Sequence, residues 1–212
     1  MEQEFKNQIV AATKPYTLLS AERILCNIES IEKVVRAGIE GDIVECGVWK
    51  GGSVMSMLYA LKELNEKRNV WLYDTFEGMT EPKDIDKDYK NESAESLLKA
   101  SSFFKCYSPI EEVSNNINKV GYIGATNFVK GDILNNKQFP DKIALLRLDT
   151  DWYDSTKYEL ENFYPLVSKG GIVIVDDYGY WKGSRLAVDE FIQGKDITLN
   201  VIDDTGVWFK KN

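Results

Sequence analysis

The sequence predicts an α/β fold in which a doubly wound, mostly parallel sheet carries a helical insertion. Short apolar segments alternate with amphipathic helical segments along the chain, which is typical of repeated strand–helix units. The segment Ile143–Leu148 is an almost continuous apolar run, as expected for a central parallel strand covered on both faces. A length of 212 residues fits one domain, so we expect a single unit over residues 1–212.

The elements follow in order from local patterns. Apolar residues with helical spacing follow Ser20, which can cap a helix that ends before Gly38. Strands are expected at 42–46, 70–73, 127–130, 143–148, 172–175, 198–202 and 207–209. Further helices are expected at 53–64, 110–120, 154–166 with Asp154 as the cap, and 184–192. The polar stretch 77–105 is too long for a simple loop, so we interpret residues 77–125 as an insertion and lid region.

Composition narrows the classes of partner and the compartment. A formal net charge of −8 argues against nucleic acid, because phosphate binding requires a basic surface. No apolar run is long enough to span a membrane, and the polar start lacks the pattern of a signal peptide. The three cysteines are far apart and suggest neither disulfides nor zinc. We therefore expect a cytoplasmic protein that binds a small molecule and has no nucleic-acid or membrane partner. We also expect the protein to form a homo-oligomer.

The sequence contains no histidine. The commonest general base and the commonest metal ligand are therefore absent. Catalysis must use carboxylates, lysine, tyrosine, cysteine or a metal held by oxygen, and such a metal should be a hard cation such as Mg²⁺.

A glycine-rich turn lies between the strand 42–46 and the helix 53–64. It reads Glu-Cys-Gly-Val-Trp-Lys-Gly-Gly-Ser from Glu45 to Ser53, and its small residues let backbone N–H groups approach a ligand at the helix N-terminus. The spacing differs from the dinucleotide pattern G-x-G-x-x-G. An ordinary strand-to-helix turn is the alternative interpretation.

Asp74 closes the second strand. A carboxylate at this position can accept the hydroxyl groups of a ribose, as acids after a glycine turn do in other doubly wound folds. A helix cap or a solvated turn residue would explain Asp74 equally well.

Acidic residues also follow two further strands. Asp149, Asp151 and Asp154 follow the strand 143–148, and Asp176 and Asp177 follow the strand 172–175. Ligands bind at the carboxyl ends of parallel strands, so these acids should lie at one rim of the sheet. Because like charges that close repel, a hard cation is the simplest partner, and Asp149, Asp176 and Asp177 are its expected ligands. We interpret Asp154 as a helix cap.

Four segments together resemble a known family. GDIVECGVWKGGS, YDTFEGM, LRLDTDWYDST and IVDDYG are similar to segments of the macrocin O-methyltransferase (TylF/MycF) family, and the resemblance runs from about Pro15 to Trp208. It implies the Rossmann-like fold of class I methyltransferases, S-adenosylmethionine as the cofactor, and Mg²⁺-dependent methylation of a sugar hydroxyl. The short N-terminal region and the missing histidine depart from the family pattern.

The resemblance also implies roles for individual residues. Glu45, Gly47 and Ser53 would line the methionine part of the cofactor, Asp74 would hold the ribose, Asp132 would lie near the adenine, and Thr17 belongs to a short matching segment near the cofactor. Asp149, Asp176 and Asp177 would bind the metal.

Two catalytic roles stay open at this level. Asp149 could bind the metal and also accept the proton of the hydroxyl, and Asp151 is the second candidate for the base. A nicotinamide-dependent oxidoreductase is a weaker interpretation because it leaves Asp176 and Asp177 unexplained. A binding protein that keeps the fold without the chemistry is a further alternative. Tyr89, Phe103, Phe104 and Tyr107 of the insertion are expected in its core or against a sugar ring.

Overall fold

The sheet has seven strands in the order β3-β2-β1-β4-β5-β7-β6. The computed structural model covers residues 1–212 and describes all of them except the side chains of Ser102 and Phe103. The first five strands in this order pair in parallel, and β7 pairs antiparallel with both of its neighbours, β5 and β6. The strands are β1 (Asp42–Cys46), β2 (Val70–Asp74), β3 (Thr126–Lys130), β4 (Ile143–Leu148), β5 (Val167–Val175), β6 (Asn200–Val201) and β7 (Val207–Lys210). The predicted doubly wound, mostly parallel sheet is confirmed.

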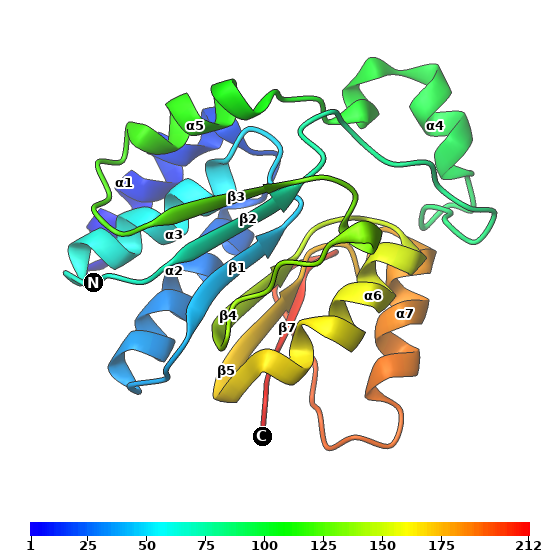
Figure 1. The fold of residues 1–212 in the computed structure, drawn as a ribbon. Helices are drawn as coiled ribbons and strands as arrows, with labels where there is room; N and C mark the ends of the chain where they lie inside the picture. The colour runs from blue at the N-terminus through cyan, green and yellow to red at the C-terminus, as the bar shows by residue number, and fades with distance from the viewer.

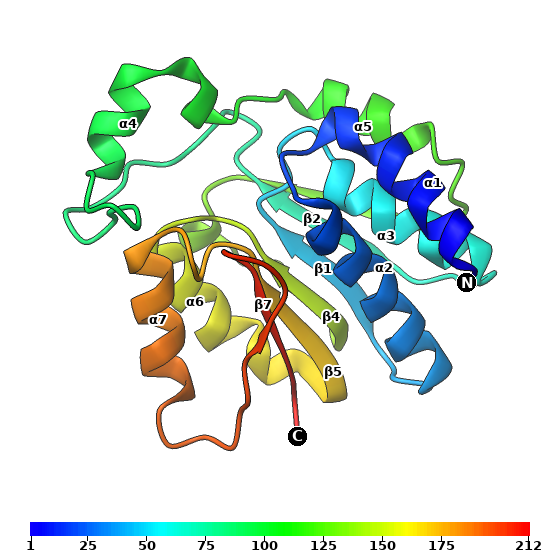
Figure 2. The same ribbon diagram turned by 180° about the vertical axis from the view of Figure 1, so that it is seen from behind.

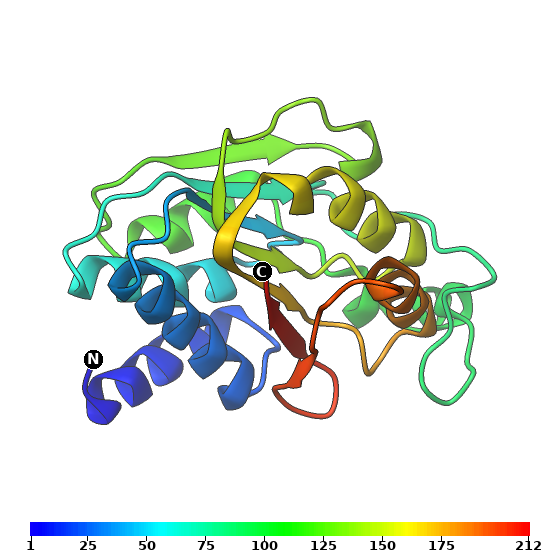
Figure 3. The same ribbon diagram turned by 90° about the horizontal axis from the view of Figure 1, so that it is seen from below.

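Helices cover both faces of the sheet (Figures 1 and 2). They are α1 (Gln3–Thr13), α2 (Ala21–Arg36), α3 (Gly52–Glu63), α4 (Ala94–Ala100), α5 (Ile110–Asn118), α6 (Tyr153–Asn162) and α7 (Lys182–Ile192), with short 3-10 turns at 14–16, 102–105, 133–135 and 164–166. Helices α1, α2, α3 and α5 form one layer, and α6 and α7 form the other, with the sheet between them (Figure 3). None of the helices in the described part of the chain is long and apolar enough to cross a membrane.

The sequence explains why β4 lies at the centre. All six residues of β4 are buried, and its apolar side chains divide between the two helical layers. Leu145 packs with the layer of α2 and α3, whereas Leu146 and Leu148 pack with the layer of α6. Arg147 is the exception: a fully buried guanidinium in the middle of an apolar strand must have charged partners close by.

The segment 75–109 stands off the carboxyl end of the sheet and includes α4 (Figure 1). A small apolar cluster of Ala94, Trp152 and Trp181 joins it to the starts of α6 and α7. Helix α5, in contrast, packs on the sheet, with Val113 and Ile117 in the main core. The part of the expected lid region 77–125 that leaves the sheet is therefore 77–109.

Several boundaries differ from the sequence-based expectations. Helix α1 was not expected, because its short stretch combines many polar residues with few apolar ones. Asp154 does not cap α6: Trp152 is the cap residue, and the Asp154 carboxylate pairs with Lys83 of the insertion. Strand β5 begins earlier than expected, at Val167. Of the four aromatic residues expected in the insertion, the Phe103 side chain lies outside the described residues, and Tyr89 and Tyr107 are exposed.

Candidate active site

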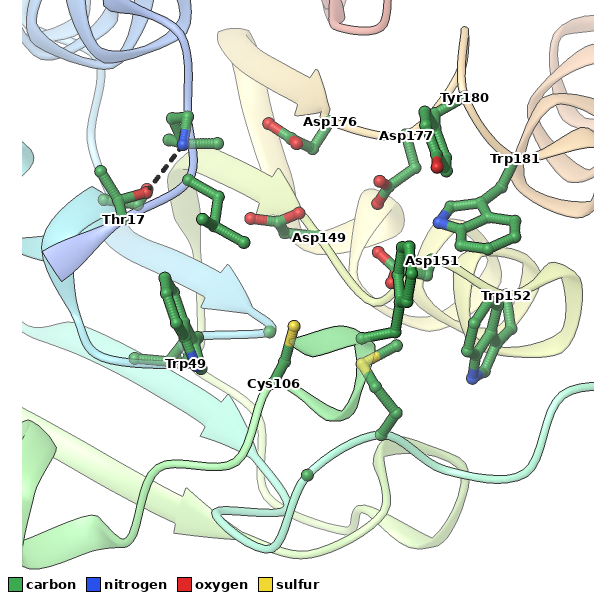
Figure 4. A pocket seen from close by; sticks show the side chains of 18 of the residues that line it. Thr17, Trp49, Cys106, Asp149, Asp151, Trp152, Asp176, Asp177, Tyr180 and Trp181 are labelled. Atoms are coloured by element: carbon green, nitrogen blue, oxygen red, sulfur yellow. Dashed lines mark hydrogen bonds between the residues drawn. The ribbon is translucent and has the colours of Figure 1, made fainter. Parts of the chain in front are cut away.

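A cavity of about 420 Å³ opens at the carboxyl ends of the parallel strands, where such folds bind ligands. One side is formed by the N-terminal segment 17–19 and the glycine-rich turn, and the other by the insertion and the starts of α6 and α7 (Figure 4). Its floor is acidic, with Asp74, Asp149, Asp151, Asp176 and Asp177 among the lining residues. The volume is in the range of small-molecule sites.

Gly47 brings the turn after β1 against the turn after β4. Its φ is +84°, and a Cβ atom built on it would lie 1.9 Å from the main-chain oxygen of Asp149. A side chain here would therefore push the glycine-rich turn away from the acidic turn. The Gly47 N–H donates to the main-chain oxygen of Tyr73, which ties the same turn to β2. The need for glycine at this position is steric as well as conformational.

Asp74 organises the glycine-rich turn. Its Oδ2 atom accepts the N–H groups of Val48 and Trp49 at 2.6 and 3.0 Å, and its Oδ1 atom accepts the N–H of Phe76 at 2.7 Å. Oγ1 of Thr75 also lies 3.4 Å from Oδ1, but its single proton is donated to the main-chain oxygen of Gly78 at 2.6 Å. A carboxylate has about four acceptor sites, so the three N–H bonds leave one for a ligand hydroxyl. Asp74 is thus placed to shape the turn and to contact a ligand in the cavity.

Three carboxylates converge at the centre of the site. Asp149, Asp151 and Asp177 each place a ligand atom within 4.8 Å of the other two. Desolvation and the neighbouring acids raise the pKa of Asp149 and Asp177 well above the usual value, and the same causes raise the pKa of Asp151 to about 8. The cluster is therefore an unfavourable arrangement of charges unless a proton or a cation neutralises part of it.

Asp176 lies beside this cluster but has different partners. Its Oδ1 atom accepts from Nη2 of Arg147 at 2.6 Å, and its Oδ2 atom accepts from Nη1 of Arg23. Arg23 comes from α2 and also donates through Nε to Asp203 at 2.9 Å. Both oxygen atoms of Asp176 are thus bonded to guanidinium groups, and Asp176 is not one of the three acids that converge.

Arg147 joins the two halves of the site. Its Nε atom donates to Oε1 of Glu45 at 2.9 Å and to Oγ of Ser53 at 2.8 Å. Its Nη2 atom donates to Oδ2 of Asp149 at 2.7 Å as well as to Asp176. Despite the attraction of Arg147, desolvation raises the pKa of Glu45 to about 7.

Most of the expected site residues line the cavity, and two of them do not. Gly47, Ser53, Asp74 and Thr17 line it, together with four of the five acids that follow β4 and β5, all except Asp154. Glu45 is fully buried behind Ser53 and Arg147 and does not line it. Asp132 lines a smaller adjoining hollow with Gly47, Asp74 and Asp149, and its carboxylate caps the 3-10 turn at Leu134.

Sequence reasoning missed three groups of lining residues. Arg23 has the spacing of an exposed helix residue, and nothing local indicates that it reaches Asp176. Trp49 lies inside the glycine-rich motif, but its role depends on a backbone conformation that the sequence does not display. The rest of the apolar wall comes from distant segments and consists of Met79, Ala94, Leu97, Leu98, Trp152, Tyr180 and Trp181, whereas Phe104, which also lines the cavity, was among the aromatic residues expected there.

Comparison with known proteins identifies the family. The family model described as Macrocin-O-methyltransferase (TylF) matches residues 7–211. Demethyldecarbamoylnovobiocin O-methyltransferase of Streptomyces niveus is 33% identical over 204 residues, which cover 92% of this chain and 76% of the relative. Mycinamicin III 3''-O-methyltransferase of Micromonospora griseorubida is 29% identical over 207 residues, covering 94% and 80%.

A solved structure agrees with these sequence relatives. The O-methyltransferase NovP superposes with a TM-score of 0.82 at 31% identity, covering 93% of this chain and 82% of that chain. The glycine-rich turn, the acid after β2 and the acidic rim after β4 and β5 thus occur on a fold shared with a known O-methyltransferase. The chain belongs to the macrocin O-methyltransferase (TylF) family and is an O-methyltransferase.

Proposed function

We propose that the enzyme transfers the methyl group of S-adenosylmethionine to a hydroxyl oxygen of a sugar or glycosylated small molecule, assisted by a divalent cation. The observation that carries this proposal is the single cavity in which the Asp74 turn meets the acidic cluster. The names of the relatives support the acceptor class, since they include a mycinamicin and a rhamnosyl-tetracenomycin methyltransferase.

The cofactor would occupy the side of the cavity formed by β1, α3 and the N-terminal segment. Asp74 has one acceptor site left for a ribose hydroxyl, and Gly47 leaves the main chain of the turn accessible. The Thr17 hydroxyl lies at the same side and accepts the N–H of Leu19 at 3.2 Å (Figure 4). Asp132 and Glu45 would act from the edge of this region rather than from its centre.

The acidic cluster supplies the oxygen donor atoms that a hard cation prefers. Asp149, Asp151 and Asp177 converge as oxygen donors, and the described residues contain no histidine that would suggest a softer metal. When bound, a divalent cation would stabilise the deprotonated form of the acceptor hydroxyl. We propose Asp149 and Asp177 as ligands, with Asp176 as the third once it leaves Arg23.

Asp151 is the proposed base. It is the member of the cluster beside Trp152 and Trp181 (Figure 4), and no arginine of the described residues pairs with it, whereas Asp149 is bonded to Arg147. In the reaction the bond between sulfur and the methyl carbon breaks and a bond between the acceptor oxygen and that carbon forms. Asp151 takes the hydroxyl proton, and neutral S-adenosylhomocysteine leaves.

The acceptor would lie against the apolar wall. Leu97 and Leu98 of α4 line the cavity from the insertion, and Trp152 and Trp181 line it as an edge-to-face pair whose ring centroids are 5.0 Å apart. Such a wall excludes water and orients a ring without competing for its hydroxyl groups.

Labelled methyl transfer tests the proposed function. Enzyme with labelled S-adenosylmethionine and Mg²⁺ should label a neutral glycoside in a panel of purified glycosides, and the product should carry a methyl ether. A thermal-shift measurement should show stabilisation by S-adenosylhomocysteine and none by NAD. Stabilisation by NAD, or methylation only of amines, would contradict the proposal.

A further inference from the structure

Trp49 has a backbone conformation that large side chains rarely adopt. Its φ is +46°, in the left-handed region, between Gly47 and Gly51, whose φ values are +84° and +88°. The two glycines on either side of Trp49 therefore have the same left-handed backbone conformation as Trp49 itself. A bulky residue with positive φ is strained, and such strain persists only where the surroundings enforce it.

Strained residues of this kind gather around the cavity. In the part of the chain that the structure describes, the non-glycine residues with positive φ are Trp49, Asn65, Phe76, Asn91, Cys106 and Asp151. Asparagine tolerates this conformation, so Asn65 and Asn91 need no special explanation. Trp49, Cys106 and Asp151 all line the cavity, and Phe76 follows Asp74 by two residues. This clustering marks the turns around the cavity as shaped for a ligand.

Main-chain contacts hold Trp49 in its strained conformation. Its N–H donates to Oδ2 of Asp74 at 3.0 Å, beside the N–H of Val48 at 2.6 Å. These bonds fix the turn but need no particular side chain at position 49, since any residue other than proline has the N–H group. Glycine would make the same bonds without strain, so the hydrogen bonds do not explain the indole.

The packing of the indole does not explain it either. Trp49 is only half-buried, in contrast to Trp152 and Trp181, which are 3% and 5% exposed. Its ring lines the cavity on the side of Thr17, away from Trp152 and Trp181 (Figure 4). Nζ of Lys50 lies 5.0 Å from the ring centroid, which shows that the ring can accept a cation.

We propose that the indole of Trp49 is a cofactor-binding group that forms the wall against the ribose and sulfonium part of S-adenosylmethionine. The proposal rests on the proposed function. The residues around it support the location: Gly47 and Ser53 are on the same turn and helix, and Asp74 is bonded to Trp49 itself. An aromatic face suits a ligand that joins a sulfonium cation to a nucleoside.

Three substitutions separate the ring from the backbone. Trp49→Gly and Trp49→Asn both tolerate positive φ and remove the ring, and asparagine does so without the flexibility of glycine. Both variants should keep the melting temperature within about 3 °C of the parent, because relieved strain offsets lost packing. Both should bind S-adenosylhomocysteine about tenfold more weakly in calorimetry, and Trp49→Phe should recover most of that loss.

Trp208 provides the matched control. It is a half-buried tryptophan with a lysine over its ring, Nζ of Lys33 at 4.5 Å, and it is not among the residues that line the cavity. Trp208→Ala should lower the melting temperature and leave the affinity for S-adenosylhomocysteine unchanged. The inference is overturned if Trp49→Asn binds like the parent, or if Trp49→Phe is as weak as Trp49→Asn. If the parent enzyme itself does not bind S-adenosylhomocysteine, the proposed function fails instead.

Discussion

At the scale of single residues, Asp176 is the point where the expected and observed arrangements differ most. The sequence placed it with Asp149 and Asp177, whereas the structure surrounds its two oxygen atoms with Arg23 and Arg147. Arg147 is fully buried and has four acidic or hydroxyl partners, so its position is fixed. Arg23 is partly exposed and lines the cavity. In this arrangement Arg23 competes with a cation for Asp176.

Replacing Arg23 should therefore strengthen metal binding. Arg23→Gln removes a positive charge beside the proposed site. Loss of about 1 kcal/mol of repulsion between the guanidinium and a cation, in partly solvated surroundings, corresponds to roughly fivefold tighter binding of Mn²⁺. Calorimetry with Mn²⁺ measures this affinity directly. Arg36→Gln is the control, because Arg36 lies on the same helix, its side chain is 68% exposed, and it pairs with Glu32 on that helix. Weaker Mn²⁺ binding by Arg23→Gln would show that Arg23 organises the site instead of competing for it.

At the scale of secondary-structure elements, the insertion has a well-packed part, residues 80–94, and a loosely packed part, residues 95–107. Asp86 and Asp88 are 2% and 3% exposed, and the Asp86 carboxylate accepts the N–H groups of Lys83 and Tyr153 at 2.8 Å. A backbone bridge also joins Asp88 to Trp181. Helix α4, in contrast, has seven residues, of which only Ala94 is buried. Any motion over the cavity should therefore be confined to the outer half of the insertion.

Hydrogen exchange can test this division. Amides of residues 80–94 should exchange slowly because of these bonds, whereas amides of residues 95–107 should exchange fast in the free enzyme and more slowly with S-adenosylhomocysteine and an acceptor. Strand β4, which is buried along its whole length, gives the reference for full protection. Equal exchange across 80–107, or no change with ligands, would remove the role of α4 as a lid.

The elements also show what the sequence could and could not predict. Periodicity and strand-ending acids were sufficient for the sheet, because each strand has its own local pattern, as in the apolar run of β4. The placement of the acids after β4 and β5 at one rim followed from topology, but the convergence of Asp151, and not Asp176, with Asp149 and Asp177 did not. The pairing of Arg23 with Asp176 joins residues 153 positions apart, and the φ of Trp49 depends on Asp74. Such tertiary relations leave no periodic signal in a single sequence.

At the scale of the whole molecule, the buried acids link stability to pH. Carboxyl groups in the unfolded chain titrate near pH 4, whereas the pKa of Glu45 is raised to about 7 and that of Asp151 to about 8 in the folded enzyme. Between these limits the folded state holds more protons than the unfolded state. These two groups therefore lower the free energy of unfolding as the pH rises from about 4 to about 8.

We expect the metal-free enzyme to melt at a higher temperature at pH 5.5 than at pH 8. Mg²⁺ should raise the melting temperature more at pH 8, where the acids of the cluster are ready to ionise, than at pH 5.5. Scanning calorimetry at both pH values, with and without Mg²⁺, measures these shifts. Asp177→Asn should show a weaker pH dependence because it removes one of the repelling charges. A melting temperature that rises steadily from pH 5.5 to pH 8 would contradict this account.

In the proposed enzyme, one cavity holds a cofactor site and a cation site with separate roles. The most direct test of these roles is methyl transfer to a glycoside by the parent enzyme, Asp149→Asn and Asp177→Asn, with S-adenosylhomocysteine affinity measured on the same preparations. EDTA should abolish turnover by the parent enzyme, and Mg²⁺ should restore it. Both variants should lose turnover by at least about a hundredfold and still bind S-adenosylhomocysteine. Full activity in EDTA, or loss of cofactor binding in both variants, would contradict these roles.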